Sequence, residues 1–202
     1  MIAAVVLAAG KSERMGRPKM CLPWRETTVI GQVVTTLLHA GLEDVVVVTG
    51  GAADEVLEAL SCLPADWPVR TVFNPGYATG EMLSSIQAGL AALGQQVEAG
   101  LIAIGDQPQM KAQVVRQVIR TYQETGAELV VPSYQMRRGH PMLLARTLWN
   151  ELRDLRSPQT LRDLVQAHQS HIVYVNVRTA SILQDLDTPE DYRRYEPPSG
   201  KS

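Results

Sequence analysis

The sequence predicts an α/β fold in three layers, with a mostly parallel sheet, helices on both of its faces and a small antiparallel addition. Apolar runs typical of buried strands alternate with helical periodicity from the first residues to about position 132. This alternation is typical of parallel sheets whose strands are connected by helices. The chain has 202 residues, of which 45% are hydrophobic and 20% are charged, a balance that suits a folded protein with a full core.

Each expected strand is a short run of apolar or β-branched residues that ends in a turn signal. The first ends in Ala-Ala-Gly at Gly10, and the third is broken by Asn74-Pro75-Gly76. The expected strands are 2–7, 45–48, 69–73, 101–104 and 129–131. Between them, apolar residues recur every three or four positions, which is the period of one helix face. The expected helices are 30–38, closed by Gly41, then 53–60, 83–93, and 114–122, stopped by Gly126.

The pattern changes after Pro132. Segments 134–138 and 142–144 flank Gly139-His140-Pro141 and are expected to form a hairpin or an antiparallel edge. Short helices near 146–152 and 160–168 and a strand at 172–175 complete the expected elements. Since no linker or repeat interrupts the chain, we expect a single domain over 1–195, followed by a frayed tail at 196–202.

Charge and hydropathy exclude several classes of protein. The formal net charge is −2, which argues against a protein whose main task is to coat nucleic acid. The apolar runs are far shorter than the ~20 residues that span a bilayer, and the apolar N-terminal stretch lacks the basic region of a signal peptide. Two cysteines without CxxC spacing are too few for a disulfide framework. We therefore expect a cytoplasmic protein with no membrane or nucleic-acid partner.

The loop after the first strand is the strongest candidate binding segment. In parallel α/β sheets, ligands bind beyond the carboxyl ends of the strands. Residues 8–19 combine two glycines with four cationic side chains, Lys11, Arg14, Arg17 and Lys19. Backbone amides and positive charge together suit a polyphosphate, although neither the P-loop pattern nor GxGxxG is present. The alternative is an ordinary basic loop in solvent.

Carboxylates predict a Mg²⁺ site. Asp106 follows a buried strand directly after Gly105, and Mg²⁺ prefers one or two carboxylates together with phosphate oxygens and water. The second carboxylate is expected from Asp185 or Asp187, which point the same way if the segment is extended. Asp106 could instead form a simple turn. Asp187 could instead cap the helix that begins at Pro189, a role for which Thr188 is equally suited.

Two further groups of residues are candidates for ligand binding, one at the turn after the third strand and one around His140. Asn74, Ser84 and Ser85 could face a ligand or merely form a turn and flank a helix. Arg138, Gly139 and His140 combine charge with backbone freedom and suit an anionic ligand, although a lone histidine is often structural. His168 and His171 have a spacing of three, but without nearby cysteine or paired acids we do not expect them to bind metal.

Five motifs occur in an order that resembles one family. They are LAAGKSERMGRPK from Leu7, NPGYATGEMLSSIQAGL from Asn74, GDQP from Gly105, RRGHP from Arg137 and DLDTPEDY from Asp185. This set resembles the MobA-like nucleotidyltransferases, and especially their molybdenum cofactor cytidylyltransferase branch. The resemblance implies a Rossmann-like nucleotidyltransferase fold and a Mg²⁺-dependent transfer of CMP from CTP to the phosphate of molybdopterin, with release of pyrophosphate.

The resemblance also implies roles for individual residues. Arg14 would clamp the outer phosphates, Lys19 would act at the α-phosphate, and Asp106 would complete the catalytic set. Arg138, Gly139 and His140 would bind the acceptor, and the product would pass to a client molybdenum hydroxylase. The nucleotide would be held by Leu7, Ala8, Ala9, Gly10, Arg14, Lys19, Asn74, Gly80, Ser84 and Ser85.

The preference for cytidine depends on two positions of the first motif. Ala9 in LAAG and Pro18 before Lys19 match the cytidylyl branch, whereas the guanylyl branch more typically reads LAGG with Asp before the Lys. The alternatives are guanylyl transfer to the same cofactor, transfer to a sugar or polyol phosphate, and a non-catalytic protein that delivers the cofactor. A dinucleotide-binding module lacks its fingerprint here.

Overall fold

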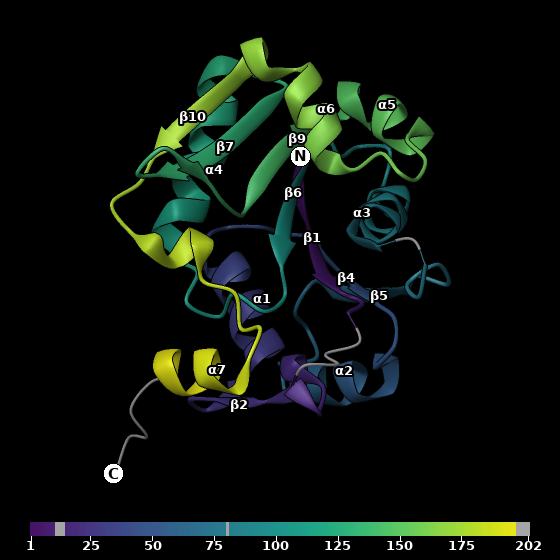
Figure 1. Ribbon diagram of the computed structural model, residues 1–202, viewed down its shortest axis with the longest axis vertical. Coiled ribbons are helices and arrows are strands. Elements are labelled where there is room, and N and C mark those ends of the chain that lie inside the picture. The colour runs from purple at the N-terminus through teal and green to yellow at the C-terminus, as the bar shows by residue number, and fades with distance from the viewer. Residues whose placement is uncertain (11–14, 80, 197–202) are drawn as a thin grey trace.

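The computed structural model describes residues 1–10, 15–79 and 81–196. Its centre is one mixed sheet in the order β10-β7-β9-β6-β1-β4-β5, with β8 paired to β7 (Figure 1). The strands of this sheet are β1 (Ile2–Ala8), β4 (Val45–Thr49), β5 (Val69–Phe73), β6 (Ala99–Ile104), β7 (Leu129–Tyr134), β8 (Arg137–Arg138), β9 (Met142–Ala145) and β10 (Ile172–Asn176). A separate antiparallel pair, β2 (Pro23–Trp24) and β3 (Thr27–Thr28), was not expected from the sequence.

The sheet is mostly parallel, as the alternation of elements predicts. Strand β1 pairs in parallel with β4 and β6, β4 with β5, and β7 with β10. Strands β8 and β9 form the antiparallel addition. Strand β9 lies between β6 and β7 rather than at an edge, because it is apolar on both faces: Leu143 and Leu144 are fully buried in opposite core clusters.

Helices cover both faces of the sheet. Helices α3, α5 and α6 pack on one face, and α1, α2 and α4 pack on the other (Figure 1). The helices are α1 (Val29–His39), α2 (Ala53–Leu60), α3 (Glu81–Ala91), α4 (Ala112–Thr125), α5 (Trp149–Asp154), α6 (Leu161–Ala167) and α7 (Pro189–Tyr195). Short 3-10 segments are η2 (Lys19–Cys21), η3 (Arg146–Leu148), η4 (Gln169–His171) and η5 (Ala180–Leu183).

The alternation of side chains along β1 builds both cores. Val5 and Leu7 face the cluster under α3, whereas Val6 and Ala8 face the cluster under α1. Every residue of β1 after Ile2 is buried, so this strand lies at the centre of the three-layer structure. The predicted three-layer α/β fold is confirmed.

The ends of several helices follow local signals in the sequence. The Thr28 hydroxyl accepts a hydrogen bond from the Gly31 amide at the start of α1, and Gly126 ends α4 in the left-handed conformation. Parallel strands direct their carboxyl ends to one edge, so the loops after β1, β5 and β6 meet there. Among the described residues, no helix is both long and apolar enough to cross a membrane. Of the expected tail, only Glu196 lies within the described residues.

Gly89 allows α3 to approach the sheet closely. A Cβ atom added at Gly89 would lie 2.2 Å from Cγ1 of Val5 and 2.9 Å from Cγ2 of Val48. Both valines are fully buried in the centre of the sheet. The glycine therefore sets the distance between β1 and the helix that carries Ser84 and Ser85.

We expect Gly89→Ala to destabilise the protein by about 1–3 kcal/mol, because overpacking forces the helix away from the sheet despite the better helix propensity of alanine. Urea unfolding monitored by circular dichroism measures this change. Ala91→Ser, at an exposed position of the same helix, is the control and should change stability by less than about 0.5 kcal/mol. Equal stability of Gly89→Ala and wild type would contradict the close packing.

Candidate active site

Lys19, Asp106 and Asp187 meet at the carboxyl edge of the sheet. The Lys19 ammonium donates a short hydrogen bond to Oδ2 of Asp106 and another of 3.1 Å to Oδ1 of Asp187. The side chains of Lys19 and Asp106 are only 13% and 7% exposed, whereas that of Asp187 is 38% exposed. Two carboxylates expected to bind metal, which are 81 residues apart in the chain, are thus brought to one point by Lys19.

Each of these three side chains is held by its local backbone. Asp106 lies in the turn that follows β6. The Gly105 amide donates a hydrogen bond of 3.0 Å to the Leu7 carbonyl, which ties the start of this turn to β1. Lys19 opens η2. The Leu186 amide donates to the Asp106 carbonyl at 3.1 Å, and the Leu186 side chain is fully buried, so the flanking aspartates project away from the core.

Thr188, rather than Asp187, caps the last helix. The Thr188 hydroxyl accepts from the Asp191 amide, while the Asp191 carboxylate accepts from the Thr188 amide, which is a capping box. The Asp191 carboxylate also accepts from the Asp187 amide at 3.2 Å. The cap alternative for Asp187 is therefore wrong, and its carboxylate instead contacts Lys19.

Burial and charge set the protonation of the pair. Burial raises the pKa of the Asp106 carboxyl, the Lys19 ammonium opposes this rise, and Asp185 and Asp187 add to it. For Lys19, burial acts to lower the pKa, but the carboxylates of Asp106 and Asp187 outweigh it and raise the pKa above its ordinary value. Lys19 therefore stays cationic and compensates the buried carboxylate.

The chemistry of these oxygens fits a hard divalent cation. Within the described part of the chain, Oδ1 of Asp106 is buried and has no hydrogen-bond partner. A buried carboxylate oxygen without a donor is costly, and a cation would satisfy it. With Asp106 and Asp187 around one point, the donor set is the one or two carboxylates that Mg²⁺ prefers.

Asp185 contacts a residue that sequence reasoning did not select. Gln107 donates from Nε2 to Oδ1 of Asp185 at 2.6 Å and to the Ile182 carbonyl at 3.4 Å. Gln107 is 2% exposed, and its Oε1 atom has no partner among the described residues. It lies in the GDQP motif, and a polar residue directly after a candidate metal ligand was the signal that could have identified it.

A cavity of about 270 Å³ opens beside Lys19 and Asp106. Of the residues expected to bind nucleotide, it is lined by Leu7, Ala9, Gly10, Lys19 and Ser85. Tyr77, Met82 and Ile104 also line it and were not selected from the sequence. The Ala8 side chain is 1% exposed and packs in the core on the α1 face, so only its backbone could contribute. Arg14 and Gly80 lie outside the described residues.

Asn74 organises the loop that borders this cavity. Its amide nitrogen donates to the hydroxyls of Ser84 at 2.8 Å and Ser85 at 3.0 Å, and its Oδ1 accepts from the Gly76 amide at 2.9 Å. Asn74 is 3% exposed. The structure thus brings the three predicted residues together, and Asn74 joins the turn after β5 to the start of α3.

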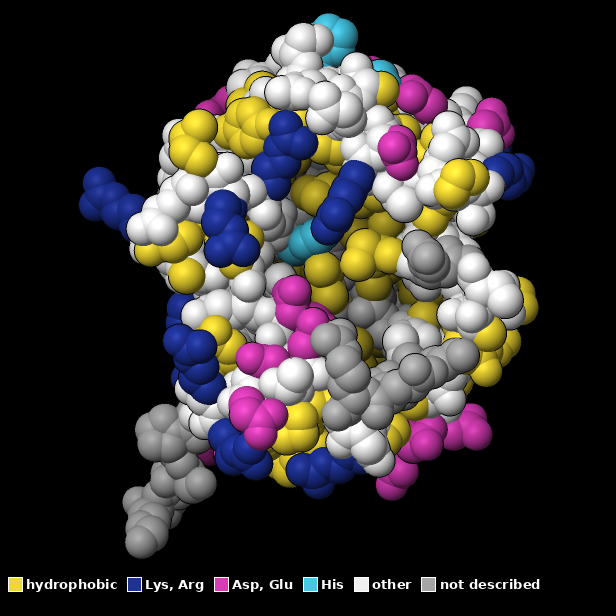
Figure 2. All heavy atoms as spheres, in the orientation of Figure 1, with side chains coloured by type: hydrophobic (Ala, Val, Ile, Leu, Met, Phe, Trp, Pro, Cys, Tyr) yellow, Lys and Arg dark blue, Asp and Glu magenta, His cyan; other side chains and the backbone are white. Residues whose placement is uncertain are grey.

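Arg138, Gly139 and His140 line a second cavity of about 690 Å³. Figure 2 shows a hollow on this face with hydrophobic side chains inside it, a histidine at its floor, cationic side chains at its upper rim and carboxylates below it. Met82 lines both cavities, so they adjoin. Arg162, a second cation on this wall, was missed because the sequence predicted only a short helix near 160–168, with no signal of a ligand there.

Gly139 permits a close backbone approach in this wall, and His140 is a buried imidazole. A Cβ atom at Gly139 would lie 2.3 Å from the Ile182 carbonyl oxygen, so only glycine permits this approach. Burial lowers the pKa of His140 to about 4, and the charge of Asp185 opposes this change. His140 is therefore neutral at pH 7, and its Nε2 atom is buried without a partner in the described part of the chain.

The fold and this site define a nucleotidyltransferase. A family model, the MobA-like NTP transferase domain, matches residues 4–172. The chain belongs to this family, and it is an enzyme of the nucleotidyltransferase class.

Known proteins similar to this chain include both curated relatives and solved structures. Molybdenum cofactor cytidylyltransferase of Escherichia coli (strain K12) is 28% identical over 193 residues, which cover 95% of this chain and 93% of that protein. Nicotine blue oxidoreductase of Paenarthrobacter nicotinovorans is 34% identical over 71% of this chain and 70% of its own length. Rv0371c of Mycobacterium tuberculosis H37Rv superposes with a TM-score of 0.81 at 32% identity, covering 96% of both chains, and its structure has also been solved as a complex with manganese.

The neutral His140 predicts a pH-dependent stability. An unfolded histidine titrates near 6.5, so between pH 6.5 and about 4 the unfolded chain binds more protons than the folded one. The contribution of His140 to stability is fully present above pH 6.5 and is lost as the pH falls towards 4, by up to about 3 kcal/mol. We expect His140→Gln to lose stability less steeply with acidification than wild type.

Urea unfolding at pH 4.5, 5.5, 6.5 and 7.5 measures this difference. At pH 7.5 the imidazole is neutral in both states, so this point isolates the packing cost of the substitution. Parallel dependences of wild type and His140→Gln over the whole range would contradict the assignment.

Proposed function

We propose that this protein transfers CMP from CTP to the phosphate of molybdopterin in a Mg²⁺-dependent reaction that releases pyrophosphate. The observation that carries the proposal is the meeting of Lys19 with Asp106 and Asp187 beside a small cavity that adjoins a larger one. The similarity to molybdenum cofactor cytidylyltransferase over 95% of the chain supports the choice of substrates.

The reaction joins two anionic phosphates, which repel each other, and the positive charges of the site would reduce this repulsion. An oxygen of the acceptor phosphate attacks the α-phosphorus of CTP, and the bond from that phosphorus to the α,β-bridging oxygen breaks. The attacking phosphate is already ionised at neutral pH, so no general base is needed. Lys19, kept cationic by its carboxylate partners, would exchange one of them for the α-phosphate and stabilise the charge that develops there.

Asp106 and Asp187 would hold Mg²⁺ together with phosphate oxygens and water. The Oδ1 atom of Asp106, which has no partner among the described residues, and the partly exposed side chain of Asp187 support this assignment. The manganese complex of Rv0371c, which superposes with a TM-score of 0.74 at 30% identity, also supports it. The metal would supply charge neutralisation and orientation of the phosphates. Asp185 accepts a hydrogen bond from Gln107 and would help to position the metal-binding carboxylates without binding the metal itself.

The acceptor would occupy the 690 Å³ cavity. Its wall combines apolar surface from Leu83, Met142 and Val165 with the cations Arg138 and Arg162. A fused ring system that carries a phosphate needs both kinds of surface. The guanidinium of Arg138 is oriented by a 2.8 Å hydrogen bond to the Tyr174 hydroxyl and lies over that ring. A molybdenum hydroxylase would be the partner that receives the product.

Asp106→Asn should lower turnover by roughly 1,000-fold, because the variant loses the charge that holds the metal but keeps the shape of the site. Nucleotide affinity without metal should change far less. Pyrophosphate release with CTP, Mg²⁺ and molybdopterin is the measurement, and Asp66→Asn, at an exposed position, is the matched control. Turnover of Asp106→Asn at the wild-type rate would refute the metal role.

The same assay distinguishes the roles of the other two carboxylates. Asp187→Asn should lower turnover more than Asp185→Asn, because Asp187 would bind the metal whereas Asp185 is held by Gln107.

CTP should exceed GTP and ATP in kcat/KM by at least about tenfold, because Ala9 lines the small cavity and its methyl group would leave less room for a purine base. Ala9→Gly should reduce the ratio of CTP to GTP. Initial rates with each nucleotide and a fixed acceptor concentration measure both effects. Equal rates with the three nucleotides would remove the cytidine assignment and leave the nucleotidyltransferase assignment intact.

A further inference from the structure

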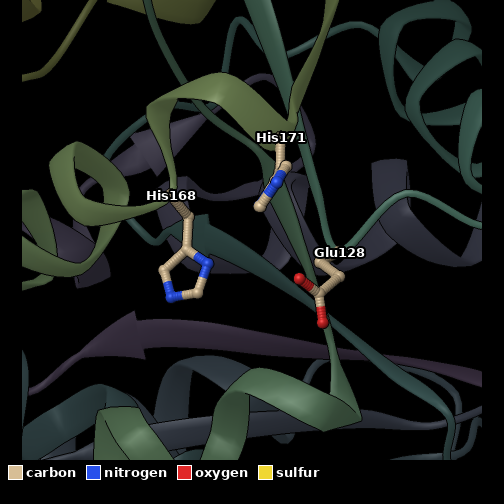
Figure 3. Close-up of side chains that lie close together, drawn as sticks. All are labelled: Glu128, His168 and His171. Carbon is tan, nitrogen blue, oxygen red and sulfur yellow. The ribbon is translucent and has the colours of Figure 1, made fainter.

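Glu128, His168 and His171 form a cluster at the amino edge of the sheet, the edge opposite the active site. Each offers one ligand atom, and these atoms all lie within 4.8 Å of one another. Figure 3 shows the three side chains close together, the two histidines on the segment between α6 and β10 and Glu128 just before β7. We infer that they form a second metal site, for a transition metal ion of the Zn²⁺ type, that ties these segments together.

The parallel pairing of β7 and β10 creates the cluster. Ile172 pairs with Leu129 at the start of both strands, so Glu128 and His171 occupy neighbouring positions just before them. Helix α6 ends at Ala167, and His168 follows as its C-cap before η4 leads to His171. From the sequence alone, metal was not expected at His168 and His171, because Glu128 is distant from them along the chain. In the structure the Glu128 carboxylate lies beside the two imidazoles, which corrects the expectation that no acid is near.

Two hydrogen bonds orient the cluster from outside. Nε2 of His168 lies 2.8 Å from Oε2 of Glu151, so when this nitrogen carries the proton, Nδ1 presents its lone pair. Figure 3 shows a ring nitrogen of His168 directed towards Glu128. Oε1 of Glu128 accepts from the Thr147 hydroxyl at 2.8 Å. Metal-bound histidine commonly donates its other N–H to a carboxylate, and such contacts fix the ring and increase metal affinity.

The donor set selects the class of metal. Two imidazoles and one carboxylate suit Zn²⁺ and its late transition-metal neighbours, whereas Mg²⁺ and Ca²⁺ prefer oxygen ligands alone. Zinc binds such atoms at about 2.0–2.2 Å, so the side chains must close in slightly from their present separation. His171 is exposed and Glu128 and His168 are half-buried, so small rotations suffice and water can supply the fourth ligand.

The test is a titration of the EDTA-treated full chain with Zn²⁺ by calorimetry and with Co²⁺ by visible absorption. To remove other metal-binding groups, the titrations use an Asp106→Asn, Cys62→Ser background, since Cys62 is an exposed free thiol. We expect one bound ion per chain and the strong visible bands of four-coordinate Co²⁺. His168→Ala and His171→Ala should each weaken Zn²⁺ binding at least 100-fold. Glu151→Gln, which alters only the outer hydrogen bond, should weaken it about 10–100-fold.

His39→Ala is the matched control, because His39 packs against Trp67 on another part of the molecule and should leave affinity unchanged. Circular dichroism without metal confirms that each variant is folded. Zinc binding that His168→Ala and His171→Ala leave unchanged, or no binding in the background protein, would overturn the proposal.

Hydrogen exchange separates a structural metal from an ion on the surface. Strand β10 is half-exposed along its length, so its amides report local opening. Zinc should slow exchange at 172–176 in wild type and not in His171→Ala. Equal exchange with and without zinc in wild type would overturn the claim that the metal ties β10 to β7 and α6.

Discussion

The buried carboxylate of Asp106 is the constraint on which the candidate active site depends. Taking an ion of this kind out of water costs several kcal/mol unless an opposite charge and hydrogen bonds compensate. The compensation comes from Lys19, 87 residues earlier in the chain. Since a hydrophobic pair of the same size would stabilise the fold at least as well, burial of this ion pair at the mouth of a cavity is better explained by function than by stability.

The contacts of Lys19 with Asp106 and Asp187 join three segments of the chain. Lys19 belongs to the loop after β1, Asp106 to the loop after β6, and Asp187 to the segment before α7. The parallel strands deliver the first two to the same edge. The third is held there by the Leu186 amide, which donates to the Asp106 carbonyl, and by the burial of the Leu186 side chain among Trp24, Val29 and Tyr192. The small hydrophobic cluster around Leu186 therefore has a functional consequence: it holds the second carboxylate in place.

Sequence periodicity predicted the fold well because most elements have a local cause. Runs of buried valine, glycine at helix ends and the Thr188 cap act within a few residues of where they stand. The central position of β9 could not be predicted in the same way, since it depends on which neighbours its two apolar faces find. The structure likewise decided between the two roles of Asp187, because Thr188 and Asp187 were equally suited as caps until the geometry was known.

The charged residues of the candidate site could be predicted from the sequence, whereas the residues that position them could not. Asp106 and Lys19 stand out because charge beside a buried strand needs an explanation. Gln107 acts through contacts with Asp185 and Ile182, which are 78 and 75 residues away, and no local pattern encodes them. The position of Glu128 beside His168 and His171 could not be predicted either. These residues are distant in the sequence, and the register of β10 on β7 brings them together.

The Ile182 carbonyl shows how the two cavities share one framework. It accepts hydrogen bonds from the Gln107 side chain and from the His140 amide, at 3.4 and 3.1 Å, and a side chain at Gly139 would collide with it. Gln107 in turn holds Asp185, next to the carboxylates at Lys19. The His140 backbone in the wall of the larger cavity and the Gln107 side chain that holds Asp185 thus share one acceptor, the Ile182 carbonyl oxygen. A common support of this kind fixes the positions of the two cavities relative to each other, and the distance between reacting groups is what a transferase must control to gain rate from positioning.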